Sequence, residues 1–252
     1  MCNKIKLVRY FIELAYKGKN FFGWQRQPNQ ISVQEVLEDK LSILLGEKIT
    51  IVGAGRTDTS VNAKQMYAHF DYSKEFDSEK LIFKLNSFLP KDIAIYKILE
   101  VEEDAHARFD ANSRAYEYYI NIGKNPFLTE SSYKINHSLD IDKMNEAAKL
   151  LLEYRDFKCF SKSRTDVKTY NCDISTAEWT KNDNQLIFYI EADRFLRNMV
   201  RAIVGSLIEV GNNKISIDEF RNIIESRDRG QAGISVPGHA LYLTKVKYPY
   251  IN

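Results

Sequence analysis

The stretch that most constrains the fold is a mostly apolar run near the C-terminus, residues 195–211. Its apolar side chains recur at helical spacing and the run stops at Gly211, which predicts a helix. A helix this apolar has to be covered by other elements. Arg201 lies within it among apolar neighbours. An arginine at the edge of a core needs a charge-compensating partner, for which a buried carboxylate would serve.

Hydrophobic periodicity places strands and helices in alternation along the rest of the chain. Ser32 and Ser216, each followed three residues later by glutamate, are typical of helix starts. Strands are expected at 7–16, 49–52, 66–70, 93–101, 113–120, 174–179, 186–191 and 241–247, and helices at 33–45, 78–89, 142–154, 195–211 and from 216 onward. The pattern predicts an α/β (α+β) protein. A chain of 252 residues allows one large domain or two halves, and an acidic run at 100–104 favours halves at 1–104 and 105–252.

Composition narrows the class of protein more than it identifies a function. The formal net charge is only +2, so binding of a polyanion would have to come from locally clustered cations. Three cysteines and four scattered histidines have no metal-ligand spacing, so neither a disulfide framework nor a metal site is expected. The polar N-terminus and the lack of a bilayer-length apolar run favour a cytoplasmic protein without a membrane anchor.

Residues 53–63 form a glycine-flanked segment that places Arg56 two residues before Asp58, between two strand-like stretches. Loops held by strands can present reactive groups. The alternative is an ordinary connection in which Asp58 caps a turn and Arg56 lies in water, and the short pattern alone favours that interpretation.

Two further segments suit RNA, each with a simpler alternative. Residues 21–28 interleave aromatic side chains, amides and a cation, a mixture that suits stacking on nucleotides, although the aromatics can equally complete the core. Residues 155–168 hold five cations against two acids and suit phosphates, although a solvated basic loop competes. Tyr116 and Tyr118 are expected on one face of a strand, where packing is the commoner role.

Taken in order, several motifs together resemble the TruA family of tRNA pseudouridine synthases, and the resemblance spans nearly the whole chain. The motifs are Phe22-Gly23-Trp24-Gln25-Arg26-Gln27, Ser32-Val33-Gln34, Gly53-Ala54-Gly55-Arg56-Thr57-Asp58, His106-Ala107-Arg108-Phe109, Arg114-Ala115-Tyr116-x-Tyr118, Phe195-Leu196-Arg197-Asn198-Met199-Val200-Arg201 and Ala240-Leu241-Tyr242-Leu243.

The resemblance implies a pseudouridine synthase fold of two similar halves, with a largely antiparallel mixed sheet, helices outside and an RNA cleft between the halves. It also implies isomerisation of uridine to pseudouridine at positions 38 to 40 of the tRNA anticodon stem-loop, without metal or organic cofactor, by a homodimer. Asp58 falls on the family's catalytic aspartate, with Tyr116 and Arg201 completing the site. The residues expected to contact RNA are Arg56, Trp24, Gln25, Arg26, Arg108, Arg114, Lys158, Lys162, Arg164 and Lys168.

The chain departs from the family pattern at Ser60, where glycine is usual, and at Asn62, where histidine is usual. These changes raise a question about loop geometry or substrate preference, while Arg56, Thr57 and Asp58 are intact. Asp58-Thr59-Ser60 also resembles the signature of aspartic peptidases. That class needs apolar residues before the aspartate and a second such carboxylate, and the sequence has neither. A non-catalytic RNA-binding relative is the third alternative, and the presence of Arg56, Asp58 and Arg201 together favours the enzyme.

Overall fold

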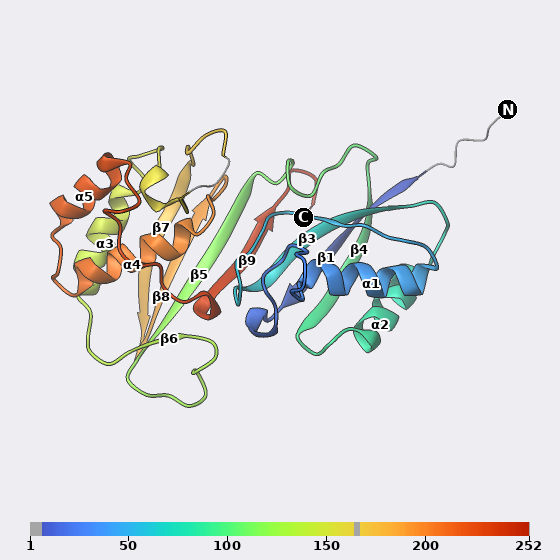
Figure 1. Cartoon of the computed structure of the whole chain (residues 1–252), viewed down its shortest axis with the longest axis horizontal. Helices are drawn as coiled ribbons and strands as arrows, with labels where there is room; N and C mark the ends of the chain where they lie inside the picture. The colour runs from blue at the N-terminus through green and yellow to red at the C-terminus, as the bar shows by residue number, and fades with distance from the viewer. Residues whose placement is uncertain (1–6, 164–166, 252) are drawn as a thin grey trace. The chain divides into compact units, whose positions relative to one another are not determined.

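The computed structural model describes residues 7–163 and 167–251, which form two compact units (Figure 1). One unit contains the described residues up to Asn112 together with those from Thr244 onward, and the other contains Ser113–Leu243. We call them unit 1 and unit 2. The expected α/β class with a largely antiparallel, mixed sheet is confirmed, because most strand pairings within the units are antiparallel and one short pairing is parallel.

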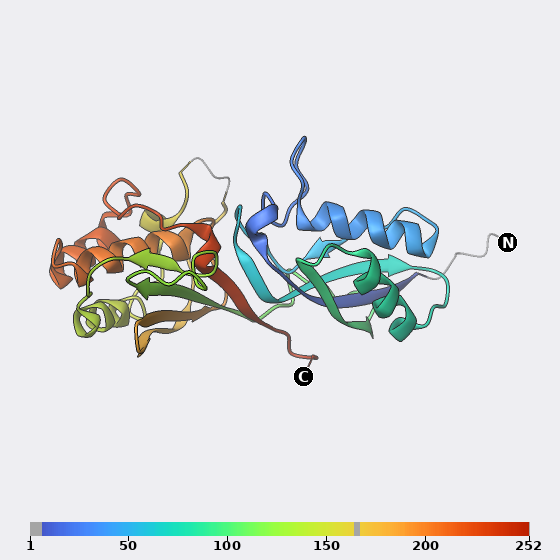
Figure 2. The same cartoon turned by 90° about the horizontal axis from the view of Figure 1, so that it is seen from below.

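Unit 1 is built on three long antiparallel strands, with β1 (Val8–Tyr16) between β3 (Asn62–Tyr72) and β4 (Ile93–Val101). A two-residue strand, β2 (Val52–Gly53), pairs with β3. Helices α1 (Val33–Leu45) and α2 (Ser78–Phe88) pack beside one another, and α2 packs on β4 (Figure 2). Both Phe11 and Ile12 are fully buried although they point to opposite faces of β1. The sheet of unit 1 is therefore covered on both faces.

In unit 2, β8 (Gln185–Ala192) lies between β5 (Ser113–Ile122) and β7 (Ile174–Asn182), all antiparallel, and a short β6 (Tyr133–Ile135) runs parallel to β5. Helix α3 (Ile141–Leu150) packs on β7, on α4 (Met199–Gly211) and on α5 (Ile217–Ser226). Ten of the thirteen residues of α4 are buried, as its apolar sequence requires. The closing strand β9 (Leu241–Lys247) contains the point at which the chain passes from unit 2 back to unit 1.

Helix ends follow local signals where side chains supply them. The hydroxyl of Ser32 accepts from Glu35 N at the start of α1, Gly46 ends the helix at φ 73, and Ser216 forms a complete capping box with Glu219 at α5. The expected start of α4 at residue 195 is wrong. Asn198 adopts the left-handed backbone conformation, so the helix begins at Met199.

Other boundaries also differ from expectation. The strand expected at 49–52 is reduced to β2, and the helix expected to run to residue 154 ends at Leu150. The short β6 and three short 3-10 helices, at Gly18–Asn20, Lys158–Phe160 and Gly238–Ala240, were not foreseen because segments of three residues carry no periodicity.

The compact units do not divide at residue 104, the boundary between the expected halves. Residues 105–112 bind to unit 1, since Arg9 donates to Ala105 O at 3.0 Å and Ala107 N donates to His69 Nδ1 at 3.1 Å. The last residues return to the same unit, where Asn112 N donates to Lys247 O at 2.9 Å. The division therefore lies between Asn112 and Ser113. It follows contacts between residues far apart in the sequence, which the acidic run at 100–104 does not indicate.

Candidate active site

The loop that carries Asp58 joins β2 to β3 in unit 1. Asp58 is half-buried, Arg56 is exposed, and Thr57 between them is buried. Val61 N donates to Asp58 O at 3.1 Å, which closes a turn directly after the carboxylate. The backbone therefore places the Asp58 side chain at a tight turn that opens to solvent on one side.

Three hydrogen bonds attach this loop to the last residue of β1 and to the segment that follows it. The Tyr16 and Thr57 hydroxyls are 2.9 Å apart, Trp24 N donates to Thr57 O at 3.2 Å, and Ser60 N donates to Phe21 O at 3.3 Å. They hold the residues on either side of Asp58. Rigid placement of a catalytic group is what a site needs to keep reacting atoms aligned.

Two glycines make this attachment possible. A Cβ on Gly23, whose φ is +89, would lie 2.4 Å from Thr57 O, and a Cβ on Gly18 would lie 2.1 Å from Val61 O. No other residue permits backbone contacts this close. The Asp58 loop and the segment that contains Gly18 and Gly23 therefore contact one another closely through main-chain atoms.

The two departures from the family pattern, at Ser60 and Asn62, both lie at structurally constrained positions of the loop. Ser60 adopts φ 64, a left-handed conformation that favours glycine. The buried side chain of Asn62 accepts from Gly18 N at 2.9 Å. Both residues therefore act on the shape and attachment of the loop.

Trp24 is expected to contact RNA, but its side chain is buried in the segment that holds the Asp58 loop. Only 3% of Trp24 is exposed, and a Cβ on Gly53 would lie 2.5 Å from its indole ring. Burial leaves no ring face for a base. The alternative in which the aromatics of residues 21–28 complete the core therefore holds for Trp24, while the neighbouring Gln25 is exposed.

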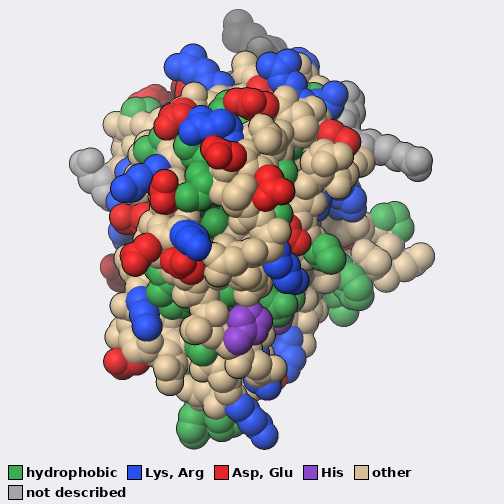
Figure 3. Space-filling model, turned by 90° about the vertical axis from the view of Figure 1, so that its left-hand side faces the viewer, with side chains coloured by type: hydrophobic (Ala, Val, Ile, Leu, Met, Phe, Trp, Pro, Cys, Tyr) green, Lys and Arg blue, Asp and Glu red, His purple; other side chains and the backbone are tan. Residues whose placement is uncertain are grey.

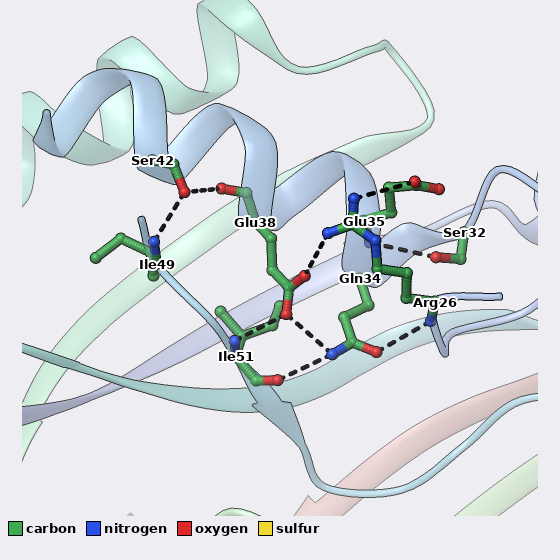
Figure 4. A network of polar contacts seen from close by, with 8 residues as sticks. All are labelled: Arg26, Ser32, Gln34, Glu35, Glu38, Ser42, Ile49 and Ile51. Atoms are coloured by element: carbon green, nitrogen blue, oxygen red, sulfur yellow. Dashed lines mark hydrogen bonds and ion pairs between the residues drawn. The ribbon is translucent and has the colours of Figure 1, made fainter. Parts of the chain in front are cut away.

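Arg26 belongs to a polar network that joins α1 to the start of β2 (Figure 4). Its guanidinium lies 3.4 Å from Glu35 and 3.3 Å from Glu38. The buried Glu38 carboxylate also accepts from Ile51 N at 3.0 Å and from Gln34 Nε2 at 3.0 Å. Half of the Arg26 side chain stays exposed, so it can still meet a phosphate, but its charge is already shared with two acids.

In unit 2, Arg201 lies in the first turn of α4 and Tyr116 lies on β5. Arg201 Nε donates to Val236 O at 2.7 Å, and Tyr118 OH donates to the next carbonyl, Pro237 O, at 3.1 Å. The ring of Tyr116 meets Phe195 edge to face at 5.2 Å. Tyr118 is fully buried while Tyr116 is half-buried. Of these two tyrosines, Tyr116 is therefore the one that can meet a ligand.

In the motif at residues 106–109, the ring of His106 lies against the ring of His69 on β3, and their centroids are 4.7 Å apart. His106 Nδ1 accepts from Arg108 N at 3.1 Å, and His69 Nδ1 accepts from Ala107 N. Burial and, to a lesser degree, the nearby Arg9 cation lower the pKa of His69 to about 4. His69 is therefore neutral at physiological pH, as its acceptor role requires, and Arg108 is presented at the surface by the turn.

Most of the expected phosphate-binding residues are at the surface of unit 2. Lys158, Lys162 and Lys168 are exposed, and Lys158 Nζ lies 5.7 Å from the centroid of the Tyr170 ring. Arg114 is half-buried and donates to Asp193 O at 2.8 Å. Arg164 lies outside the residues that the structure describes.

A hollow of about 550 Å³ between the ends of α3 and α5 is a poorer candidate for an anion. Its Arg227 lies 3.2 Å from Asp156, and the neighbouring Arg221 lies 3.3 Å from Glu153. Cations and acids are interspersed over the whole face of unit 2 that carries α5 (Figure 3). The hollow has no excess of positive charge with which to select a phosphate.

Sequence reasoning missed the residues that support the site. These residues are Gly18, Gly23, Thr57 and 233–237, and they contact partners far away in the chain through main-chain atoms and through the hydroxyls of Thr57 and Ser235. Their only sequence signals are the glycines themselves, which mark close backbone approach without naming a partner. Within residues 7–163 and 167–251, no three His, Cys, Asp or Glu side chains are arranged to hold a metal ion. None of the helices in these ranges is long and apolar enough to cross a membrane.

Comparison with known proteins identifies the family. A family model described as "tRNA pseudouridine synthase" matches residues 14–110 and 147–249, ranges that include Asp58 and Arg201. The chain is 57% identical over 242 residues to tRNA pseudouridine synthase A of Parabacteroides distasonis, and 55% identical over 243 residues to that of Bacteroides fragilis, in both cases over 96% of each chain. It is 39% identical to the Clostridium acetobutylicum protein of the same name, over 94% of this chain and 98% of that one.

These matches decide between the alternatives that the Asp-Thr-Ser sequence left open, because the aspartic peptidase interpretation has no counterpart among them. A matched family model over both halves of the chain, with near full-length relatives above half identity, is a far more specific finding than the short motif. The chain belongs to the TruA family of tRNA pseudouridine synthases.

Proposed function

We propose that this member of the family isomerises uridine to pseudouridine at positions 38 to 40 of the tRNA anticodon stem-loop, with Asp58 as its catalytic carboxylate. The observation that carries the proposal is the placement of Asp58, half-buried at a turn whose two sides form hydrogen bonds with Tyr16, Trp24 and Phe21. A carboxylate held in this way is both oriented and accessible to a nucleoside.

The reaction breaks the bond between the ribose and N1 of uracil, turns the base without releasing it, and joins C5 to the same ribose carbon. The proton that C5 carried is lost and N1 gains one, so the product is an isomer and no cofactor is needed. Asp58 adds covalently to the ribose or the base, or it removes a ribose proton to give an unsaturated sugar. All three routes require one carboxylate beside the sugar.

Two further residues are assigned catalytic roles by the family resemblance. We assign to Arg201 the cation that acts with the Asp58 carboxylate, a role that accounts for an arginine at the edge of an apolar helix. Tyr116 stacks on the uracil or assists proton transfer. The target uridine has to leave its stack first, at a cost of a few kcal/mol. We assign the exposed Arg56, beside the carboxylate, to the vacated position.

The partner is tRNA, held through its phosphates and unpaired bases by the remaining surface residues. We assign this contact to Gln25, Arg26, Arg108, Arg114, Lys158, Lys162 and Lys168, together with Arg164 from outside the described residues. With a net charge of +2, RNA binding depends on where these cations lie and not on their total. By family resemblance, the protein acts in the cytoplasm as a homodimer, without metal.

Asp58→Asn is the direct test, because the amide keeps the shape of the carboxylate and removes its charge and its nucleophilicity. The variant is expected to bind tRNA as the wild type does and to form no detectable pseudouridine. Pseudouridine is mapped in the anticodon stem-loop of tRNA after incubation with each protein, and binding is measured separately by filter retention.

Asp39→Asn is the matched control, since it makes the same change on an exposed position of α1. It should leave both binding and product unchanged. Pseudouridine formation by Asp58→Asn at the wild-type rate would exclude Asp58 as the catalytic group. Product confined to uridines outside positions 38 to 40 would instead contradict the substrate assignment.

A further inference from the structure

Residues 233–237, which precede the short helix at Gly238–Ala240, form a strap across the face of α4 that carries Arg201. The face consists of Asn198, Arg201 and Gly205, which follow one another at three- and four-residue spacing. Two consecutive carbonyls of the strap accept hydrogen bonds, Val236 O from Arg201 Nε and Pro237 O from Tyr118 OH. It therefore lies directly against the proposed catalytic arginine.

The near end of the strap is bound to Arg201 through both main chain and side chain. Val236 N donates to Arg201 O at 3.2 Å, while Arg201 Nε donates to Val236 O at 2.7 Å. A guanidinium has five N–H groups, and the four others sit on its two terminal nitrogens. The strap therefore fixes the guanidinium at its Nε end.

The middle of the strap is fixed through Ser235. Its hydroxyl accepts from Asn198 Nδ2 at 2.6 Å and from Arg229 Nη2 at 2.9 Å. Arg229 also donates to Ala232 O at 3.2 Å, just before the strap begins. Asn198 is the residue whose left-handed backbone sets the start of α4. Ser235 thus ties the strap to the first turn of the helix, where Arg201 lies.

The far end of the strap touches the helix backbone. A Cβ on Gly205 would lie 2.0 Å from Ile234 O, and one on Gly233 would lie 2.9 Å from Ser206 N. The buried Ser206 hydroxyl accepts from Gly233 N at 2.9 Å and donates to Ala202 O at 3.0 Å. Glycine on both sides of this contact lets the strap lie flat on α4.

We propose that residues 233–237 are a positioning element for catalysis, which fixes the orientation of the Arg201 guanidinium, and that Ser235 is its central positioning residue. This inference rests on the role proposed for Arg201. A long arginine side chain loses much rotational freedom when it forms an ion pair, and a strap that fixes it beforehand removes that cost from the reaction.

The test is a double-mutant cycle between Ser235→Ala and Arg201→Lys, measured as single-turnover rates and as KM for tRNA. Ser235→Ala should slow pseudouridine formation about tenfold to a hundredfold with KM little changed, since a small misplacement of a catalytic group costs rate. Ser235→Thr, which keeps the hydroxyl, should restore most of the rate. In the Arg201→Lys background, Ser235→Ala should have no further effect, because the residue it positions is already gone.

Ser216→Ala is the matched control, because it removes a serine hydroxyl that caps α5 in the same unit without touching the strap. Its rate should stay at the wild-type value. A Ser235→Ala rate equal to the wild type, or an equal slowing in the Arg201→Lys background, would overturn the positioning role. Arg201→Lys with full activity would overturn it as well, and would also contradict the Arg201 role in the proposed function. Loss of product in Asp58→Asn is independent of all these outcomes.

Discussion

Ser60 is a residue of the active-site loop whose backbone conformation is disfavoured by its own Cβ. Its φ of 64 costs an L-residue on the order of 1 kcal/mol, and glycine adopts the same conformation freely. Glycine also gives the unfolded chain more freedom, which offsets part of the gain. We expect Ser60→Gly to raise the free energy of unfolding by about 0.5 kcal/mol, measured by urea denaturation.

Ser60→Ala separates backbone strain from the hydroxyl, because alanine keeps the Cβ that the left-handed conformation disfavours. It should not stabilise the protein. Equal stabilisation by alanine and glycine would show that strain at Ser60 is not the cause. The rate of the Ser60→Gly variant should stay close to the wild type if this departure from the family pattern concerns loop shape alone.

At the scale of elements, the junction between α1 and β2 depends on one buried carboxylate. Glu38 is 6% exposed and accepts from the Ile51 main chain, from Gln34 and from Arg26. Gln34 Nε2 also donates to Ile51 O at 3.1 Å, so both main-chain polar groups of Ile51 are satisfied by α1 (Figure 4). This junction fixes the strand that leads into the Asp58 loop.

Glu38→Ala should lower the free energy of unfolding by about 2–3 kcal/mol, because it leaves Ile51 N and the Gln34 amide without their acceptor in a buried place. Glu38→Gln keeps one acceptor oxygen and should cost less. Thermal and urea unfolding of the two variants, compared with the wild type, measure the difference. A loss below about 0.5 kcal/mol for Glu38→Ala would mean that water replaces the carboxylate at this junction.

At the scale of the molecule, unit 1 is completed by two segments that come from beyond its own sheet. Residues 105–112 bind His69 and Arg9, and the returning C-terminal residues cover Phe11 with Tyr248, whose ring centroid is 5.3 Å from that of Phe11. Tyr250 OH donates to Asp110 at 2.8 Å, which joins the two segments. Both segments therefore contribute to the core of unit 1.

The buried His69 makes stability depend on pH in a defined window. Its pKa is about 4 in the folded protein and about 6.5 when unfolded, so the unfolded chain takes up the proton first as the pH falls. The stabilisation is fully present above pH 6.5 and is lost between about pH 6.5 and 4, by up to about 3 kcal/mol. Burial also lowers the pKa of His106, which acts in the same direction.

His69→Gln should flatten the fall in the free energy of unfolding over this window, because glutamine does not titrate. Urea denaturation at several pH values between 4 and 7.5 measures the slope. His137→Gln, at an exposed position, should keep the wild-type slope. An unchanged slope in His69→Gln would assign the acid sensitivity to other groups, among them His106, whose pKa is also lowered by burial.

The sequence alone determined the features that depend on nearby residues. Periodicity and capping predicted α1, α5 and most strands, because a helix or strand is specified by the spacing of its own side chains. Ordered motifs predicted the family, and the structure adds the half-buried Asp58 at a tight turn. The start of α4 escaped prediction because the apolar pattern continues through Asn198, whose left-handed conformation interrupts the helix and whose side chain donates to Ser235, far along the chain.

Only the tertiary structure decided which residues support the site and which meet solvent. Trp24 has an aromatic side chain suited to stacking on RNA bases, yet Gly53 lets the β2 backbone approach the ring and bury it. The strap at 233–237 has no periodicity, and its meaning comes from carbonyls that accept from Arg201 and Tyr118. Contacts of this kind join residues 35 and 119 positions apart, and side-chain spacing within one element contains no information about them.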